Sequence, residues 1–183
     1  YNSGESFNAD SMKFNSNESY QTLLKERTVY GGGGIIPDHF VPLDTTGTSA
    51  YFNKLIRKGI FNQFALSWVN KNREYLEKKY PNFDKFNSKF DTQNAVDELI
   101  EYAEVEGLEF KEDQYNKAKH VIHTRLKANI AQDLFNYKKF YQIINDLNNA
   151  LEKSLELLKD DKAFSKLAMN NNSNNHDIGI YGI

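Results

Sequence analysis

The chain has 183 residues, with 23 Lys and Arg against 25 Asp and Glu, so its formal net charge is −2 and its pI is about 6.1. This balance argues against a general nucleic-acid-binding protein, whose domain is normally basic. A mean hydropathy of −0.70, with no apolar run near the roughly 18–20 residues that cross a bilayer, excludes a membrane-spanning helix. The lack of cysteine excludes a disulfide framework, a thiolate nucleophile and cysteine zinc sites.

The first 47 residues are expected to form strands and loops. Four consecutive glycines at residues 31–34 would interrupt any helix. Residues 27–30 and 35–41 on either side are rich in β-branched and aromatic types, which predicts two short strands around a glycine turn.

Residues 48–169 carry the apolar spacing of helices, with large side chains at intervals of three and four. The pattern predicts about five helices: two between residues 48 and 80 that meet at Gly59, then residues 93–106, residues 112–140 and one from about residue 145. Asp91 or Thr92 is expected to cap the third helix, and Gly107 to follow its end. The residues expected to face the core are Phe52, Leu55, Ile56, Phe61, Phe64, Ala65, Trp68, Val96, Leu99, Ile100, Ala103, Ala118, Ile122, Leu126, Ile130, Leu134, Tyr137, Tyr141, Leu147, Leu151, Leu155 and Leu158.

The C-terminal residues change character again. Residues 170–175 are all Asn or Ser, as in a polar linker, and an apolar tail with Ile178, Ile180 and Ile183 follows. We therefore expect a β segment at residues 1–47, a helical domain at residues 48–169, and a linker with its tail at residues 170–183. The fold class is mainly α, a helical bundle preceded by a short β segment.

The glycine run invites comparison with phosphate-binding loops. Such loops place a Lys-Ser/Thr pair and a helix directly after the glycines, whereas here Ile35, Ile36 and Pro37 continue in extended form. A tight connection between strands, where another backbone passes closely, is the favoured interpretation.

Three histidines are candidate site residues. His120 and His123, three residues apart on a helix, could share a metal, but Lys119, Arg125 and Lys127 make the local field unfavourable for a cation. They are interpreted as ordinary helix residues. His39 lies in the extended segment without a recognisable nucleophile motif beside it. No metal and no cofactor is expected.

Charge is segregated along the helical region. Residues 97–113 contain eight acidic side chains and Lys111, while residues 117–139 contain six basic ones and Asp133. The favoured interpretation is that two consecutive helices of opposite sign pack with complementary faces. A basic strip that binds RNA or an acidic protein is the alternative.

Residues 27–44 resemble the C-terminal processing, or tail-specific, serine peptidases. The catalytic domain of that family closes with a segment of the form Gly-x-Gly-Ile-x-Pro-Asp-x-x-Val. The similarity extends through helical blocks at residues 64–73, 80–83 and 126–134, which resemble the C-terminal extension of members from Bacteroides-like bacteria, and it spans about residues 27–158. The matching motif residues are Gly32, Gly34, Ile35, Pro37, Asp38 and Val41.

The resemblance implies a secreted or periplasmic, cell-envelope-associated endopeptidase with a PDZ domain, an α/β catalytic domain and a Ser nucleophile activated by a Lys base. The family's two dyad motifs precede the glycine motif and are not found in this chain, so the dyad is expected upstream of Tyr1 and no catalytic residue is assigned here. The chain alone is expected to be inactive. Its partners would be protein or peptide substrates of the whole enzyme, with homo-oligomerisation left open and no nucleic acid.

Two interpretations therefore compete. In the first, residues 1–47 are the trailing β segment of a catalytic domain, and the helical domain serves assembly, gating or substrate engagement. In the second, the chain is a free-standing helical protein-interaction module. The glycine segment favours the first, because two isolated strands are marginally stable unless they belong to a larger sheet.

Overall fold

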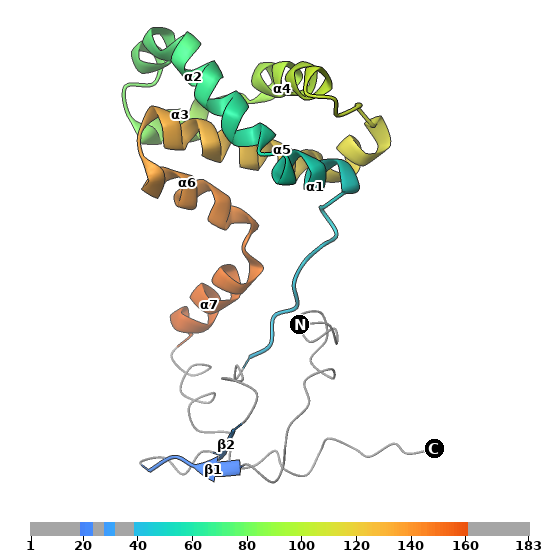
Figure 1. Ribbon diagram of the computed structural model, residues 1–183. Coiled ribbons are helices and arrows are strands. Elements are labelled where there is room, and N and C mark those ends of the chain that lie inside the picture. The colour runs from blue at the N-terminus through green and yellow to red at the C-terminus, as the bar shows by residue number, and fades with distance from the viewer. Residues whose placement is uncertain (1–18, 24–27, 32–38, 161–183) are drawn as a thin grey trace. The chain divides into compact units, whose positions relative to one another are not determined.

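The computed structural model describes residues 19–23, 28–31 and 39–160, and the protein is mainly α-helical, as the sequence predicts (Figure 1). Its contacts divide the chain into two compact units. One is Thr45–Asn148, and the other combines Tyr1–Asp44 with Asn149–Ile183. The domain boundaries expected after residues 47 and 169 stay predictions.

The unit that contains both ends of the chain includes a short antiparallel pair of strands. Strand β1 (Ser19–Gln21) pairs with β2 (Thr28–Tyr30), and Tyr20 lies opposite Val29. The strand predicted at residues 27–30 is present over Thr28–Tyr30, but its partner precedes it in the chain. Of the second predicted strand, residues 35–38 lie outside the described residues, and residues 39–41 are not in a strand.

The same unit includes α7 (Asn149–Lys159), where the sequence predicts the last helix. None of its residues is buried, and Leu155 and Leu158 are well exposed. The prediction that these leucines face a core is wrong for the described residues, because the described part of this unit has no second helix against which the stripe could pack. The Asn-rich linker and apolar tail lie outside the described residues.

The helical unit begins with α1 (Ala50–Arg57) and α2 (Ile60–Lys79). The hydroxyl of Ser49 accepts a hydrogen bond from the backbone N–H of Phe52 at 3.2 Å and so caps α1. Gly59 separates the two helices with φ of 69°, a left-handed conformation that glycine adopts without a Cβ penalty. The predicted junction at Gly59 is confirmed.

A short helix that the sequence analysis did not predict, α3 (Phe83–Lys89), follows Pro81. Asn82 caps it, because its Oδ1 accepts a hydrogen bond from the backbone N–H of Lys85 at 2.9 Å. Phe86 is its one buried residue. With only two turns and one apolar anchor, α3 is too short to show a periodic stripe in the sequence.

Helix α4 (Gln93–Val105) agrees closely with the predicted third helix, and Gly107 follows it with φ of 74°. Thr92 occupies the N-cap position without capping through its side chain. Instead, Oδ1 of Asp91 accepts a hydrogen bond from the backbone N–H of Gln93 at 2.9 Å. Both residues proposed for this helix start thus take part in it.

The predicted helix at residues 112–140 is two helices. Helix α5 (Glu112–Leu134) ends at Leu134 with Phe135 as its C-cap. Helix α6 (Tyr137–Ile144) starts anew after Asn136, whose Oδ1 accepts from the backbone N–H of Lys138 at 3.1 Å. A short 3₁₀ turn, η3 (Asn145–Leu147), follows. The break changes the helical phase, so the expectation that Tyr137 and Tyr141 continue the buried stripe is wrong: they are 61% and 45% exposed.

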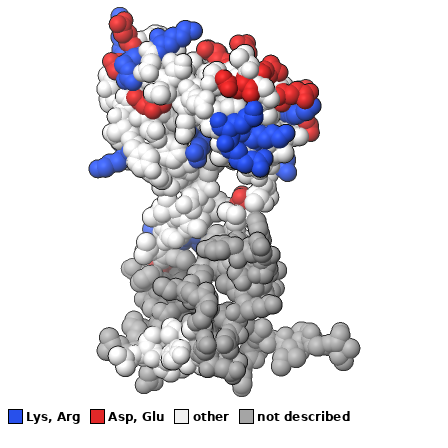
Figure 2. Space-filling view, viewed as in Figure 1, with Lys and Arg blue, Asp and Glu red and all other residues white. Residues whose placement is uncertain are grey.

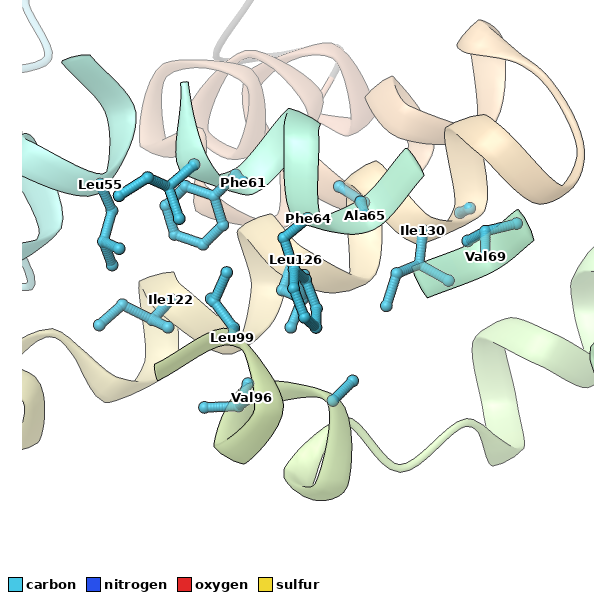
Figure 3. Packing of buried hydrophobic residues seen from close by; sticks show 14 of the residues in the cluster. Leu55, Phe61, Phe64, Ala65, Val69, Val96, Leu99, Ile122, Leu126 and Ile130 are labelled. Atoms are coloured by element: carbon cyan, nitrogen blue, oxygen red, sulfur yellow. The ribbon is translucent and has the colours of Figure 1, made fainter. Parts of the chain in front are cut away.

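The core forms around α5, which packs against α1, α2, α4 and α6. Figure 3 shows side chains from α1, α2, α4 and α5 pointing toward one another. Phe61 and Phe64 are buried as predicted, whereas Trp68 is only partly buried and Ile56 is 40% exposed. Val69, beside Trp68, takes the inward position, and the indole packs at the rim of the core against Phe90 with ring centroids 6.2 Å apart.

Candidate functional site

Most of the glycine run lies outside the described residues. Gly31 follows β2 directly, but residues 32–34 lie outside the described residues, so the expected strand connection stays a prediction.

His39 lies at an open pocket of about 300 Å³ between residues 39–42 and α7. Lys153 and Glu156, which also line it, form an ion pair at 2.7 Å. None of the lining residues carries a hydroxyl or thiol, so the pocket offers His39 no such group to activate. The lining residues are His39, Phe40, Val41, Pro42, Asn149, Glu152, Lys153 and Glu156.

The two histidines of α5 have different environments. His120 is exposed, whereas His123 is half-buried and both of its ring nitrogens have partners. Nδ1 lies 2.7 Å from Oγ1 of Thr92, and Nε2 lies 3.0 Å from the hydroxyl of Tyr115. In the part of the chain that is described, no group of three or more His, Asp or Glu side chains is arranged to hold a metal ion.

The surroundings of His123 favour a neutral imidazole. Burial lowers the pKa of His123 below its usual value, and the positive charge of Lys119 acts in the same direction. A neutral ring has one donor and one acceptor nitrogen, and a hydroxyl can complement either. The hydroxyl of Thr92 contacts His123 and makes no capping hydrogen bond to α4. The arrangement ties the start of α4 to α5 and is structural.

The charged residues are arranged differently from the favoured expectation. Figure 2 shows acidic side chains gathered over α4 with a basic group beside them over α1. The ammonium of Lys58, which follows α1, donates to the carbonyl oxygen of Glu106 at 2.8 Å, and Lys54 helps Lys111 to lower the pKa of Glu109. The acidic segment after α4 thus interacts with the basic end of α1, and no ion pair between α4 and α5 is seen among the described residues.

The most distinctive exposed feature of the helical unit is a pair of tyrosines on α6. The hydroxyls of Tyr137 and Tyr141 lie 2.7 Å apart, and their rings are nearly perpendicular with centroids 5.0 Å apart. Phe140 is buried beneath them, and its ring is parallel to that of Tyr137 at 6.4 Å. We call Tyr137, Lys138 and Tyr141 the tyrosine surface.

The tyrosine surface has basic groups and no acidic residue on its own helix. Helix α6 contains Lys138 and Lys139 and no acidic residue. The guanidinium of Arg125 on α5 lies 4.9 Å from the ring centroid of Phe140, and Nζ of Lys139 lies 4.3 Å from that of Phe83. The contact between a cation and a ring face holds Arg125 close to Phe140 below the tyrosines, whereas Lys139 lies against Phe83 of α3.

The acidic groups nearest in sequence to α6 interact elsewhere. Asp133 lies near Arg73, whose charge partly offsets the rise that burial causes in the pKa of Asp133. The negative charge of Asp146 acts on Lys127, where it partly offsets the lowering of the pKa by burial. The tyrosine surface is therefore aromatic and positively charged. The apolar pattern does not predict this surface, although Asn136, a good N-cap residue, is a signal for a new helix start.

Residues 51–136 match the sequence profile of a family of unknown function, DUF8443. The match lies wholly within the helical unit Thr45–Asn148. Neither the curated proteins nor the solved structures include a significant match to the chain. None of the described helices is long and apolar enough to span a membrane.

Proposed function

We propose that the chain is the non-catalytic C-terminal part of a C-terminal processing serine endopeptidase. The observation that carries this proposal is the segment with Gly32, Gly34, Pro37 and Asp38, and the resemblance of the helical blocks that follow it gives further support. The Ser/Lys dyad would come from the part of the enzyme that precedes this segment. The enzyme would act in the periplasm or at the cell envelope.

The strand pair supports this proposal. Ser19, Tyr20 and Gln21 of β1 are all exposed, and Tyr20 is 61% exposed. A two-stranded sheet alone is marginally stable in water, and stability normally requires further strands or a covering layer. Strands β1 and β2 are suited to the edge of a larger sheet, as the trailing segment of a catalytic domain would be.

The helical unit would engage polypeptides for the enzyme. It has its own core around α5 and an exposed aromatic and basic surface on α6. Exposed tyrosines are enriched where proteins bind other proteins, because a rigid ring supplies a large contact area together with a polar tip.

The free-standing interaction module is the second candidate. The observation that favours it is the family match, which covers residues 51–136 and leaves out the β segment altogether. A helical unit that is recognisable without the preceding strands could occur in proteins of other architectures.

The test compares two proteins: the product of the complete reading frame that encodes the chain, and residues 1–183 alone. We expect the complete product to contain a Ser/Lys dyad and to cleave unfolded protein substrates, and to lose this activity when the dyad serine is replaced by alanine. We expect residues 1–183 alone to cleave nothing. A complete product without a dyad, or without peptidase activity, would leave the interaction module as the function.

A further inference from the structure

We propose that the tyrosine surface of α6 binds an extended polypeptide segment in which apolar or aromatic residues lie beside carboxylates. This inference rests on the proposed function, since it names the class of polypeptide that the helical unit would engage. Three features of the surface support it: its exposed aromatic area, its rigidity and its charge.

The aromatic area is concentrated at one place. Tyr137 and Tyr141 are adjacent on one turn of α6 and are 61% and 45% exposed. Tyr75 on α2 is similarly exposed, at 59%, but its contacts are with a lysine, Lys79, rather than with a second exposed tyrosine. The pair on α6 therefore offers two rings to one ligand, whereas Tyr75 offers one.

The tyrosine pair is fixed before any ligand binds. The bond between the two hydroxyls and the buried Phe140 below the rings restrict their rotation. A surface whose side chains are already ordered loses less conformational entropy on binding than one with free side chains. Rigid, partly exposed tyrosines of this kind are typical of the residues that dominate binding energy.

The charge selects the ligand. Lys138 has no ion-pair partner among the described residues, and α6 has no acidic residue that would repel a carboxylate. A ligand that places a carboxylate near Lys138 and an apolar side chain on the tyrosine rings complements both features. A nucleic acid is less well matched, because the chain as a whole carries a net charge of −2.

The proposal is tested with residues 1–183 and short fluorescent peptides, by fluorescence anisotropy. One peptide contains Asp and Glu beside Phe and Leu, a second replaces the acidic residues with Lys, and a third replaces the apolar residues with Ser. We expect the first peptide to bind at least about tenfold more tightly than either of the others, which corresponds to the loss of one well-placed contact. Binding of the first peptide should weaken as salt rises.

Variants locate the site. Replacing both tyrosines, Tyr137→Ser with Tyr141→Ser, should weaken binding of the acidic apolar peptide by roughly tenfold or more, as expected for a pair of dominant contacts. Lys138→Glu should weaken it as well and should improve binding of the lysine peptide. Tyr75→Ser is the matched control and should leave the affinity unchanged. Circular dichroism and thermal melting verify that each variant is folded.

The following outcomes would overturn the proposal. Equal binding of the acidic and basic peptides would remove the role of charge, and equal weakening by Tyr75→Ser would remove the role of this surface. A single-stranded RNA that displaces the acidic peptide would favour a nucleic-acid ligand instead. No binding of any peptide to folded chain would end the proposal. These results are separable from the proposed function, because peptidase activity of the complete product is measured without these peptides.

Discussion

The hydroxyl of Tyr115 lies 3.0 Å from Nε2 of His123, two helical turns further along α5. The other ring nitrogen of His123, Nδ1, lies close to Oγ1 of Thr92, the residue that precedes α4. His123, a candidate metal ligand by sequence, therefore has both ring nitrogens in contact with hydroxyl groups of the protein. Its chemistry bears on the stability of the helical unit, where it links two helices.

The chain should lose stability as the pH is lowered, because His123 titrates. In the unfolded chain its pKa is about 6.5, and burial lowers the pKa in the folded chain. Between the two values the unfolded state binds more protons, so the free energy of unfolding decreases as pH falls below about 6.5 until it passes the folded pKa. His123→Gln keeps polar atoms without this proton equilibrium and should flatten that part of the profile in urea unfolding.

The control for this prediction is His120→Gln, since His120 is exposed on the same helix. Asp91 and Asp97 raise the pKa of His123 and partly oppose the effect of burial, while His120 lowers it slightly further. Asp133 contributes a slope of opposite sign at lower pH, because burial raises its pKa. The comparison is therefore between each variant and the wild-type chain. A profile that His123→Gln leaves unchanged would contradict the prediction.

Phe86→Ala should cost about 3–5 kcal/mol of the free energy of unfolding, as for other fully buried aromatic residues. Phe86 is 0% exposed, and its ring stacks on Phe90 at 4.6 Å and meets the edges of Tyr80 and Phe135 at 5.6 and 5.7 Å. Chemical denaturation measures the loss. Phe83→Ala, in the same helix at a partly exposed position, is the control and should cost less. Equal losses would contradict the packing described for α3.

Helices with a long apolar stripe can be predicted from the sequence. Helices α4 and α5 begin within about a residue of their predicted starts, because Val96, Leu99 and Ala103 on α4, like Ile122 and Leu126 on α5, repeat one face over several turns. Helix α3 was missed because it is only seven residues long and Phe86 is its one buried residue. Strand β1 was missed because Ser19–Gln21 is three residues long and its partner is seven or more residues further along the chain.

The candidate surface could not be predicted because it depends on a break in a helix. Over residues 112–140 the sequence gives one nearly continuous apolar pattern, and an uninterrupted helix would place Tyr137 and Tyr141 with Leu134 on the buried face. The structure ends α5 at Leu134, and Asn136 caps a second helix with a new phase. Two outcomes compete at Asn136: a cap that starts a new helix, and the continuation of α5. Packing between α5 and α6 decides between them, and the linear sequence pattern carries no information about that packing.

Gly107→Ala should destabilise the helical unit by about 1–2 kcal/mol, the cost of a left-handed backbone for a residue with a Cβ. Gly107 has φ of 74°, and an added Cβ would meet nothing within 4 Å, so the cost is conformational rather than steric. Gly107→Asn should cost less, because asparagine tolerates this region better than alanine. Thermal or urea unfolding measures both variants. An alanine variant as stable as the wild type would show that the end of α4 rearranges.

The hydroxyl of Ser49 should contribute more to stability than the equivalent cap of α3. Ser49 is 7% exposed, and its Oγ accepts from the backbone N–H of Phe52, which is itself buried. Ser49→Ala would leave that donor without its partner in a place that water reaches poorly, at a cost near the upper end of the usual range of about 0.5–2 kcal/mol.

The matched control is Asn82→Ala, which removes the cap of α3. Asn82 is exposed, so water can replace its carbonyl oxygen at the N–H of Lys85, and the loss should lie near the lower end of the same range. Ser49→Thr keeps a hydroxyl at the position and should restore much of the stability that Ser49→Ala loses. Urea unfolding of the three variants gives the comparison. If Asn82→Ala cost as much as Ser49→Ala, burial would not be what strengthens the cap of α1.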